Sequence, residues 1–193
     1  MKKSNFMSML FRMKYINRWS LMRNVRNENL KEHSFDTAAI AHAIMVIGKK
    51  RFSKSYDEKA VVLSALYHDC PETLTGDMPT PVKYYNESIR KVYKDIEKIS
   101  EDKILSLLPE DFRDEYESYI RPENEEVKLI CKAADRISAI IKCREEIEAG
   151  NKEFTDAYKS QIEALKKMNI PEADLFIELY LDSFFMTLDK IQA

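Results

Sequence analysis

Glycine is almost absent from this sequence, and that scarcity limits the folds open to the chain more than any other feature. Only three of the 193 residues are glycine, whereas soluble domains average about 7%. Folds rich in β-structure need many tight turns in which glycine supplies a positive φ. Apolar residues instead recur at helical spacing along nearly the whole chain, with no alternating strand pattern or internal repeat. The sequence therefore predicts an all-α protein, and its length fits one domain covering residues 1–193.

Helical periodicity divides the chain into eight expected helices, with proline or glycine near the breaks. Their approximate ranges are 4–15, 31–47, 57–69, 86–107, 110–120, 123–149, 152–168 and 172–191. Gly48 and Gly150 stand where a glycine would end a helix. Residues 17–29 and 72–83 are expected to form non-helical stretches. Functional side chains often lie on such loops when a rigid scaffold holds them.

The charge balance and the cysteines narrow the class of protein. Lysine and arginine number 31 against 33 acidic residues, a net charge of −2, which disfavours a polymeric nucleic-acid partner. Arg12, Lys14 and Arg18 interrupt the apolar stretch that a signal peptide would need, and no other uncharged run is long enough to span a membrane. Three cysteines without CxxC spacing are typical of free thiols in a reducing compartment. We therefore expect a cytoplasmic protein without a membrane partner.

Two of the three histidines fall on apolar helix faces. In the helix expected over 57–69, His68 and Asp69 share a face with Val61 and Ala65. A buried aspartate beside a histidine is costly unless it is paired or binds a cation. His33 lies on one stripe with Ile40 and Ile44, whereas His42 is half a turn away and is expected to serve packing.

A further carboxylate comes from the helix expected over 123–149. Asp135 has Cys131, Ser138 and Ala139 as helical neighbours, and these small residues leave room around its carboxylate. Two imidazoles and two carboxylates form a mixed set suited to a divalent metal with open positions for water and substrate. Such a metal can acidify water and polarise a phosphoryl oxygen. Taken singly, each histidine also fits a core residue, and each aspartate a salt bridge or helix cap.

The order His33, His68-Asp69 and Asp135 in an all-helical chain resembles the HD-domain metal-dependent phosphohydrolases. Longer motifs resemble, more narrowly, the bacterial 5′-deoxynucleotidase (YfbR-like) family. These motifs are Ile16-Asn17-Arg18-Trp19, Leu21-Met22-Arg23-Asn24, Glu28-Asn29, Glu32-His33-Ser34, Leu74-Thr75-Gly76-Asp77-Met78-Pro79-Thr80-Pro81-Val82-Lys83-Tyr84 and Asn151-Lys152-Glu153-Phe154. The similarity is dense over residues 14–150, and beyond about 155 only helical character matches. It implies hydrolysis of deoxyribonucleoside 5′-monophosphates by a single HD-domain helical bundle.

The resemblance also implies roles for individual residues. His33, His68, Asp69 and Asp135 would hold one divalent metal ion, cobalt or manganese in this family. Glu72 would position or deprotonate the attacking water; on its own it also fits a carboxylate at a helix start.

Arg18 would orient the phosphate, a task suited to its planar fork of donors, and Trp19 would select against a ribose 2′-hydroxyl. Asp77 would contact the sugar or assist the leaving group, after a sharp turn at Gly76. The implied catalytic residues are thus Glu72, Arg18 and Asp77. The implied substrate contacts are Arg18, Trp19, His33, Asp69, Asp77, Met78, Pro79, Thr80 and Asp135.

The partners implied by the resemblance are deoxyribonucleoside 5′-monophosphates and a second copy of the chain in a cytoplasmic homodimer. Two other interpretations compete. One is an HD-domain phosphohydrolase acting on another nucleotide, although Thr73 stands where a guanosine tetraphosphate hydrolase would have a second acid. The other is a non-catalytic helical binding or scaffold protein, which would have no need to retain Glu72 together with all four metal ligands.

Overall fold

Helices make up nearly all the regular structure of the computed structural model, which describes residues 3–83 and 85–192. The side chain of Thr80 lies outside that description. Within the described residues, the extended pairing consists of an isolated antiparallel bridge between Asn17 and Asn29. The prediction of an all-α fold is confirmed.

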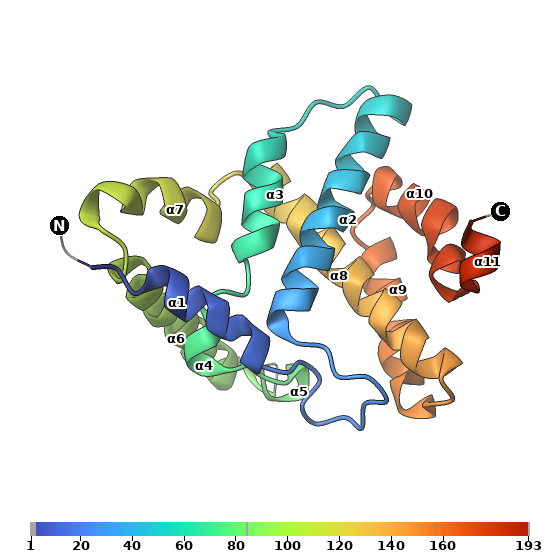
Figure 1. Ribbon diagram of the computed structural model, residues 1–193, viewed down its shortest axis with the longest axis horizontal. Helices are drawn as coiled ribbons and strands as arrows, with labels where there is room; N and C mark the ends of the chain where they lie inside the picture. Colours follow the sequence, from blue (N-terminus) through green and yellow to red (C-terminus); the bar gives the residue numbers. More distant parts are fainter. Residues whose placement is uncertain (1–2, 84, 193) are drawn as a thin grey trace.

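Two long helices cross near the centre of the molecule and carry the larger hydrophobic core (Figure 1). They are α2 (Leu30–Arg51) and α8 (Glu125–Glu148), and α3 (Glu58–Tyr67), α9 (Thr155–Lys166) and α10 (Pro171–Tyr180) pack against them. Their inward faces place aliphatic side chains at helical spacing. Central members of this first core include Ile40, Ile44, Met45, Val61, Ala65, Ile130, Ala134, Ile137, Ile140, Leu165, Ile170 and Phe176.

A second, smaller core lies at the other end of the molecule (Figure 1). It is built by α1 (Phe6–Leu10), η1 (Phe11–Tyr15), α6 (Glu87–Ser106) and α7 (Arg113–Ile120). Its buried members are Phe6, Met13, Leu30, Cys70, Ile104, Leu105, Leu108 and Ile120. Leu30 precedes His33 by three residues and Cys70 directly follows Asp69, so His33, His68 and Asp69 come from segments that join the two cores.

Short helices complete the chain and correct the sequence prediction in two places, at residues 72–83 and within the helix expected over 172–191, which ends at Tyr180. The short elements are α4 (Glu72–Thr75), α5 (Thr80–Lys83), η2 (Glu110–Phe112), η3 (Lys152–Phe154), η4 (Leu181–Phe185) and α11 (Leu188–Ile191). Residues 72–83 were expected to be non-helical, which is wrong for α4 and α5. Proline begins each turn, because Pro71 is the N-cap of α4 and the Pro79 carbonyl accepts from the Lys83 amide at 3.1 Å.

Two of the three glycines lie at helix ends, and the third lies inside a helix. Gly150 (φ 87°) follows the end of α8 and Gly76 (φ 74°) ends α4, both as expected. Gly48 was expected to end a helix, but α2 continues to Arg51. A Cβ at Gly48 would lie 2.8 Å from Cζ of Tyr56, so close packing of this side chain explains the glycine.

The start of α2 is set by a reciprocal cap. Asn29 Oδ1 accepts from the amides of Lys31 (3.0 Å) and Glu32 (3.1 Å), and Glu32 Oε2 accepts from the Asn29 amide at 3.3 Å. This capping box places His33 in the first turn of α2, where its side chain is fully buried. His42, which was expected to serve packing, is instead exposed on the same helix.

None of the helices in the described part of the chain combines the length and apolar character needed to cross a bilayer.

Candidate metal centre and active site

Three side chains from three different helices converge on one point. His33 comes from the first turn of α2, His68 from the C-cap of α3 and Asp135 from the middle of α8. His33 Nε2 lies 3.2 Å from His68 Nε2 and 3.2 Å from Asp135 Oδ1, and one atom from each residue lies within 4.8 Å of the other two. Ligand atoms around one divalent ion are spaced in this way when each is about 2 Å from the ion. The structure thus brings together three of the four predicted ligands.

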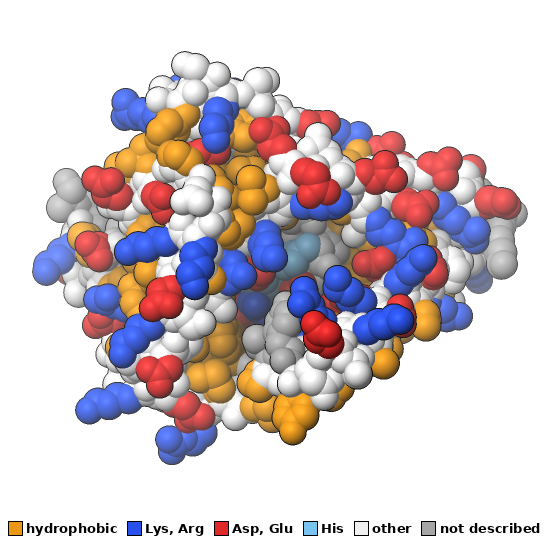
Figure 2. Space-filling view, turned by 180° about the vertical axis from the view of Figure 1, so that it is seen from behind, with side chains coloured by type: hydrophobic (Ala, Val, Ile, Leu, Met, Phe, Trp, Pro, Cys, Tyr) orange, Lys and Arg blue, Asp and Glu red, His pale blue; other side chains and the backbone are white. Residues whose placement is uncertain are grey.

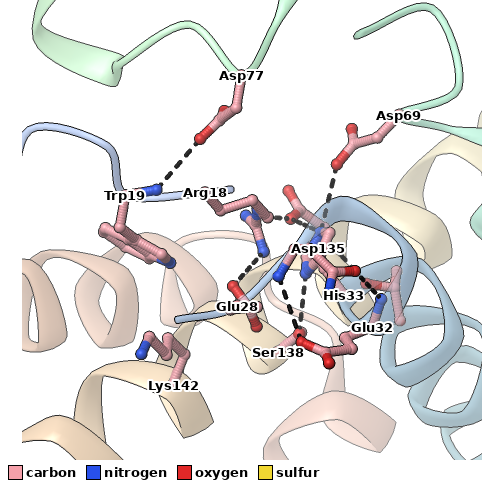
Figure 3. A network of polar contacts seen from close by, with 12 residues as sticks. Arg18, Trp19, Glu28, Glu32, His33, Asp69, Asp77, Asp135, Ser138 and Lys142 are labelled. Atoms are coloured by element: carbon pink, nitrogen blue, oxygen red, sulfur yellow. Dashed lines mark hydrogen bonds and ion pairs between the residues drawn. The ribbon is translucent and has the colours of Figure 1, made fainter. Parts of the chain in front are cut away.

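Asp69, the fourth predicted ligand, lies beside this group and contacts both histidines. Its Oδ1 is 3.2 Å from His68 Nε2, and its Oδ2 is 3.6 Å from His33 Nε2 (Figure 3). Its carboxylate adds a second negative charge next to the group, as a dication would require. Thiolates are absent from the set, which favours an open site over a closed structural zinc site.

Hydrogen bonds behind the two imidazoles orient them toward the point of convergence. The Nδ1–H of His68 donates to the Ala65 carbonyl at 2.7 Å, so Nε2 is the ring atom turned toward the other ligands. His33 Nδ1 lies 3.0 Å from the Ser138 hydroxyl, one turn along α8 from Asp135. A metal-binding histidine usually has its other ring nitrogen bonded in this way. The residues present therefore fit a divalent cation.

The protonation of the two histidines differs strongly. Burial and the nearby Arg18 lower the pKa of His33 to about 4, so this ring is neutral near pH 7. Burial also opposes a charged His68, but Asp69 and Asp135 outweigh it and raise the pKa of His68 to about 9. Burial would raise the pKa of Asp69, yet His68, His33 and Arg18 lower it well below its usual range. The Asp135 side chain is 41% exposed, which leaves access for a small ligand.

Glu72 begins α4, three residues after Asp69. Its Oε1 accepts from Lys83 Nζ at 3.1 Å, whereas its Oε2 is buried without a hydrogen-bond partner. Burial, followed by the charge of Asp69, raises the pKa of Glu72 to about 8, and Lys83 opposes the rise. A carboxyl group whose pKa lies near the working pH is suited to exchanging a proton with water. The unpartnered oxygen is the atom available for that task.

Arg18 lies on the loop of residues 17–29, and its side chain lies beside the metal-binding group. Its Nη1 donates to Glu28 Oε2 at 3.0 Å, and its Nη2 is 3.8 Å from Asp135 Oδ1 (Figure 3). The side chain is 13% exposed. The Arg18 amide also donates to the Glu28 carbonyl, and the Leu30 amide to the Ile16 carbonyl, so the two ends of the loop are tied together. A fixed guanidinium beside a metal site is suited to binding a phosphate.

Trp19 and Asp77 join this loop to the segment after α4. The Trp19 amide donates to Asp77 Oδ2 at 3.2 Å (Figure 3), and the indole packs on Phe154, with ring centroids 5.4 Å apart. Met78 and Pro79 follow Asp77 and are half-buried, while the predicted contact of the Thr80 side chain falls outside the described residues. Figure 2 shows a hollow on this molecule, with histidine atoms visible inside it and several Lys and Arg side chains around its rim.

A search of known families matches residues 5–184 to the family described as 5′-deoxynucleotidase YfbR-like. The chain belongs to this family.

Curated relatives support the assignment over the full length. A 5′-deoxynucleotidase of Vibrio atlanticus (strain LGP32) is 45% identical over 193 residues, which cover 99% of this chain and 100% of the relative. The 5′-deoxynucleotidase YfbR of Escherichia coli (strain K12) is 45% identical over 194 residues, covering 99% and 97% of the two chains.

Solved structures show the same fold at lower identity. An HD-domain phosphohydrolase from Listeria innocua superposes with a TM-score of 0.81 at 20% identity, over 95% of this chain and 90% of its own. The cyanophage S-2L HD phosphohydrolase DatZ, solved with dA and one catalytic Zn²⁺, gives a TM-score of 0.67 at 17% identity, over 91% and 96% of the chains. These two likenesses identify the all-α HD-domain fold.

In this YfbR-like chain, three residues close to the site make contacts that the sequence did not predict. Ser138 had been read only as a small neighbour of Asp135, yet it also touches His33. Glu28 accepts a hydrogen bond from Arg18 and is only 9% exposed, although an acidic residue is usually expected at the surface. Lys83 was considered a possible source of positive potential or an ordinary surface charge, but it is paired with Glu72 and only 20% exposed. The Ser138 contact joins segments 105 residues apart, whereas Glu28 lies 10 residues from Arg18 and Lys83 lies 11 residues from Glu72. Helical periodicity determines none of these contacts.

Proposed function

We propose that this YfbR-like chain hydrolyses deoxyribonucleoside 5′-monophosphates to the deoxyribonucleoside and inorganic phosphate. The observation that carries the proposal is the convergence of His33, His68 and Asp135 beside Arg18. The names of the curated relatives, 45% identical over almost the whole chain, support the substrate class. The other HD-domain activities considered from the sequence have no comparable support.

The proposed metal ligands are His33, His68, Asp69 and Asp135. A bound divalent cation would polarise a phosphoryl oxygen and lower the pKa of a bound water. We propose cobalt or manganese on the basis of the family, since imidazole and carboxylate ligands by themselves accept several such ions and cellular supply selects among them.

The protein's own side chains would then arrange the substrate. Arg18 would bind two phosphate oxygens with its planar fork, replacing its long contact of 3.8 Å with Asp135. The reaction forms a bond between a water oxygen and phosphorus and breaks the bond between phosphorus and the 5′-oxygen. Glu72 would take the proton released by the water, and that proton would then pass to the leaving 5′-oxygen.

The deoxyribose would lie between the two loops that Trp19 and Asp77 join. Asp77 would bind the sugar or assist protonation of the leaving 5′-oxygen, because burial raises the pKa of its carboxyl above the usual range. The Trp19 ring would stand against the sugar edge and leave no space for a 2′-hydroxyl. Met78, Pro79 and Thr80 would complete the substrate loop.

We also propose that two copies form a homodimer through α6. One face of this helix exposes Ile89, Val92, Ile96 and Ile99, which are 37–66% accessible and spaced three and four residues apart. Residues 87–94 of α6 carry Arg90, Lys91 and Lys94 against Glu87, and residues 95–106 carry Asp95, Glu97, Glu101 and Asp102 against Lys98 and Lys103. Glu101 and Asp102 also pair with Arg121 of the same chain. An antiparallel copy would therefore pair opposite charges along an apolar seam.

Light scattering after size-exclusion chromatography tests this dimer. We expect the wild-type protein to have twice the mass of one chain and Ile99→Glu to be monomeric. Val46→Glu, at a 41% exposed site on α2, is the matched control and should remain dimeric. A wild-type monomer, or a dimeric Ile99→Glu variant, would refute the α6 interface.

We further propose that residues 1–193 form a single domain and that the protein is cytoplasmic. Free Cys70, Cys131 and Cys143 support a reducing compartment.

Phosphate release tests the activity directly. The protein would be stripped of metal with a chelator, reloaded with Co²⁺, Mn²⁺, Zn²⁺ or Mg²⁺, and assayed with the deoxy- and ribonucleoside 5′-monophosphates of each base. We expect release only after reloading, and faster release from the deoxy substrates. Failure to release phosphate from any deoxymonophosphate with any of the four metals would rule out the proposed function.

A further inference from the structure

Lys83 is mostly buried and paired with a carboxylate, whereas a lysine is usually exposed to solvent. It is the last residue of α5, its side chain is 20% exposed, and its ammonium group is 3.1 Å from Oε1 of Glu72, which is 13% exposed. A largely buried pair of this kind is held much more firmly than a surface salt bridge, because removal of one partner leaves a buried charge uncompensated.

An aromatic ring from a third helix confines the same ammonium group. Lys83 Nζ lies 4.8 Å from the ring centroid of Tyr93, which is 7% exposed on α6. A cation over a tyrosine face gains electrostatic energy and loses freedom to move. Elements α4, α5 and α6 thus supply the carboxylate, the cation and the ring respectively, and α6 packs against both short helices. The lysine head has a fixed place beside Glu72.

The two oxygens of Glu72 consequently have different roles. Oε1 is engaged by Lys83, whereas Oε2 is buried and has no hydrogen-bond partner. A carboxylate held through one oxygen cannot rotate freely, so the position of the other oxygen is also defined. The surroundings make this support necessary, because the charges of Asp69 and Asp77 both act against an ionised Glu72 and Lys83 acts for it.

We propose that Lys83 is a positioning residue for the hydrolysis, which holds Glu72 by Oε1 so that Oε2 is presented to the reacting water. The inference rests on the proposed function, in which Glu72 handles the proton of the water. It assigns Lys83 no contact with substrate or metal. Loss of Lys83 should therefore affect the rate of the bound complex and leave substrate binding and metal content unchanged.

Steady-state kinetics of Lys83→Met and Lys83→Arg with a deoxymonophosphate and saturating metal test the proposal. We expect Lys83→Met to lower kcat by about 10- to 100-fold, the usual cost of losing a supporting hydrogen bond at a metal site, with KM changed less than about threefold. Lys83→Arg, which keeps the charge and a donor, should recover most of the lost rate. Lys50→Met, at an exposed site on α2, is the matched control and should match the wild type.

A double-mutant cycle with Glu72→Gln separates positioning from general structural damage. If Lys83 acts through Glu72, adding Lys83→Met to Glu72→Gln should lower the residual rate less than about twofold. An undiminished effect of Lys83→Met in that background would overturn the inference, and so would a rise in KM without loss of kcat, which would make Lys83 a substrate contact. Helical circular dichroism and metal content of each variant identify any that fails to fold.

The same set of variants distinguishes this inference from the function on which it rests. Near-native turnover by Glu72→Gln would refute the catalytic role of Glu72 itself. A strong defect in Glu72→Gln together with wild-type kinetics for Lys83→Met would refute only the role of Lys83.

Discussion

The backbone amide of Trp19 donates a hydrogen bond of 3.2 Å to Oδ2 of Asp77, and Trp19 has a φ of 59°. Few residues other than glycine adopt this left-handed conformation, which costs of the order of 1 kcal/mol. The carboxylate of Asp77 satisfies the amide that this conformation turns toward it. Backbone strain at Trp19 is thereby maintained by a residue 58 positions away.

Substitution of Asp77 should separate its structural role from its charge. Asp77→Asn retains an oxygen that can accept from the Trp19 amide, and Asp77→Ala does not. We expect Asp77→Asn to lower kcat while keeping the deoxy-over-ribo ratio of kcat/KM, and Asp77→Ala to lower both. Kinetics with matched deoxy- and ribonucleotides measure the two effects. Equal ratios in both variants and the wild type would show that the hydrogen bond does not support selection.

Replacement of the Trp19 ring should weaken discrimination against ribonucleotides. We expect Trp19→Ala to narrow the deoxy-over-ribo ratio by about tenfold or more, since a shaped pocket wall discriminates by roughly 1–3 kcal/mol. Trp19→Phe retains a flat ring against Phe154 and should keep most of the ratio. If Trp19→Ala leaves the ratio as it is in the wild type, the ring serves packing on Phe154 alone.

Asp135 should be required for metal retention. Asp135→Ala removes one of the two carboxylates among the proposed ligands and leaves His33, His68 and Asp69. We expect elemental analysis after dialysis to find less than about a tenth of the wild-type metal, in line with the 10- to 100-fold losses seen even for supporting residues. Asp156→Ala, at a 99% exposed side chain on α9, is the control and should retain metal. Full metal content in Asp135→Ala would remove this residue from the ligand set.

Helical periodicity and chain order allowed prediction of the all-α fold and of the helices that carry His33, His68 and Asp135. These features are local, because an apolar helix face and the polar residue on that face both lie within one helix. Gly48 was misjudged because a glycine inside α2 is explained only by the approach of Tyr56. The contacts of Ser138 and Lys83 were unpredictable for the same reason, since each joins segments whose packing the periodicity does not determine.

Glu146 should make stability depend on acid pH. This carboxylate, 2% exposed on α8, accepts from the amides of Val25 and Arg26 and from Asn151 Nδ2, and pairs with Lys142. Burial opposes its ionisation, but the Lys142 bond and the amides outweigh burial and lower its pKa from 4.5 to about 2. Because the folded pKa is depressed, the stabilisation is complete above about pH 4.5 and is lost as the pH falls toward 2.

The size of this effect can be measured with Glu146→Gln. A pKa about 2.5 units below the ordinary value corresponds to about 3 kcal/mol at neutral pH. We expect urea unfolding to show Glu146→Gln destabilised by about 2–3 kcal/mol at pH 7, with the gap to the wild type shrinking below pH 4. Glu148→Gln, at a 49% exposed side chain on the same helix, should be nearly neutral. A constant gap between pH 7 and 3 would show that ionisation of Glu146 does not support the loop.

Replacing Gly48 by alanine should destabilise the protein, although the same substitution normally stabilises a helix. Alanine inside an exposed helix is favoured over glycine by about 1 kcal/mol. At Gly48, however, the added Cβ would lie 2.8 Å from Cζ of Tyr56, whose hydroxyl is held by Glu172 Oε1 at 2.7 Å. The ring cannot withdraw without breaking that bond, so we expect Gly48→Ala to lower the free energy of unfolding by about 1–3 kcal/mol, the usual cost of overpacking. Urea unfolding of Gly48→Ala measures the sign directly, and an increase in stability would show that Tyr56 yields at little cost.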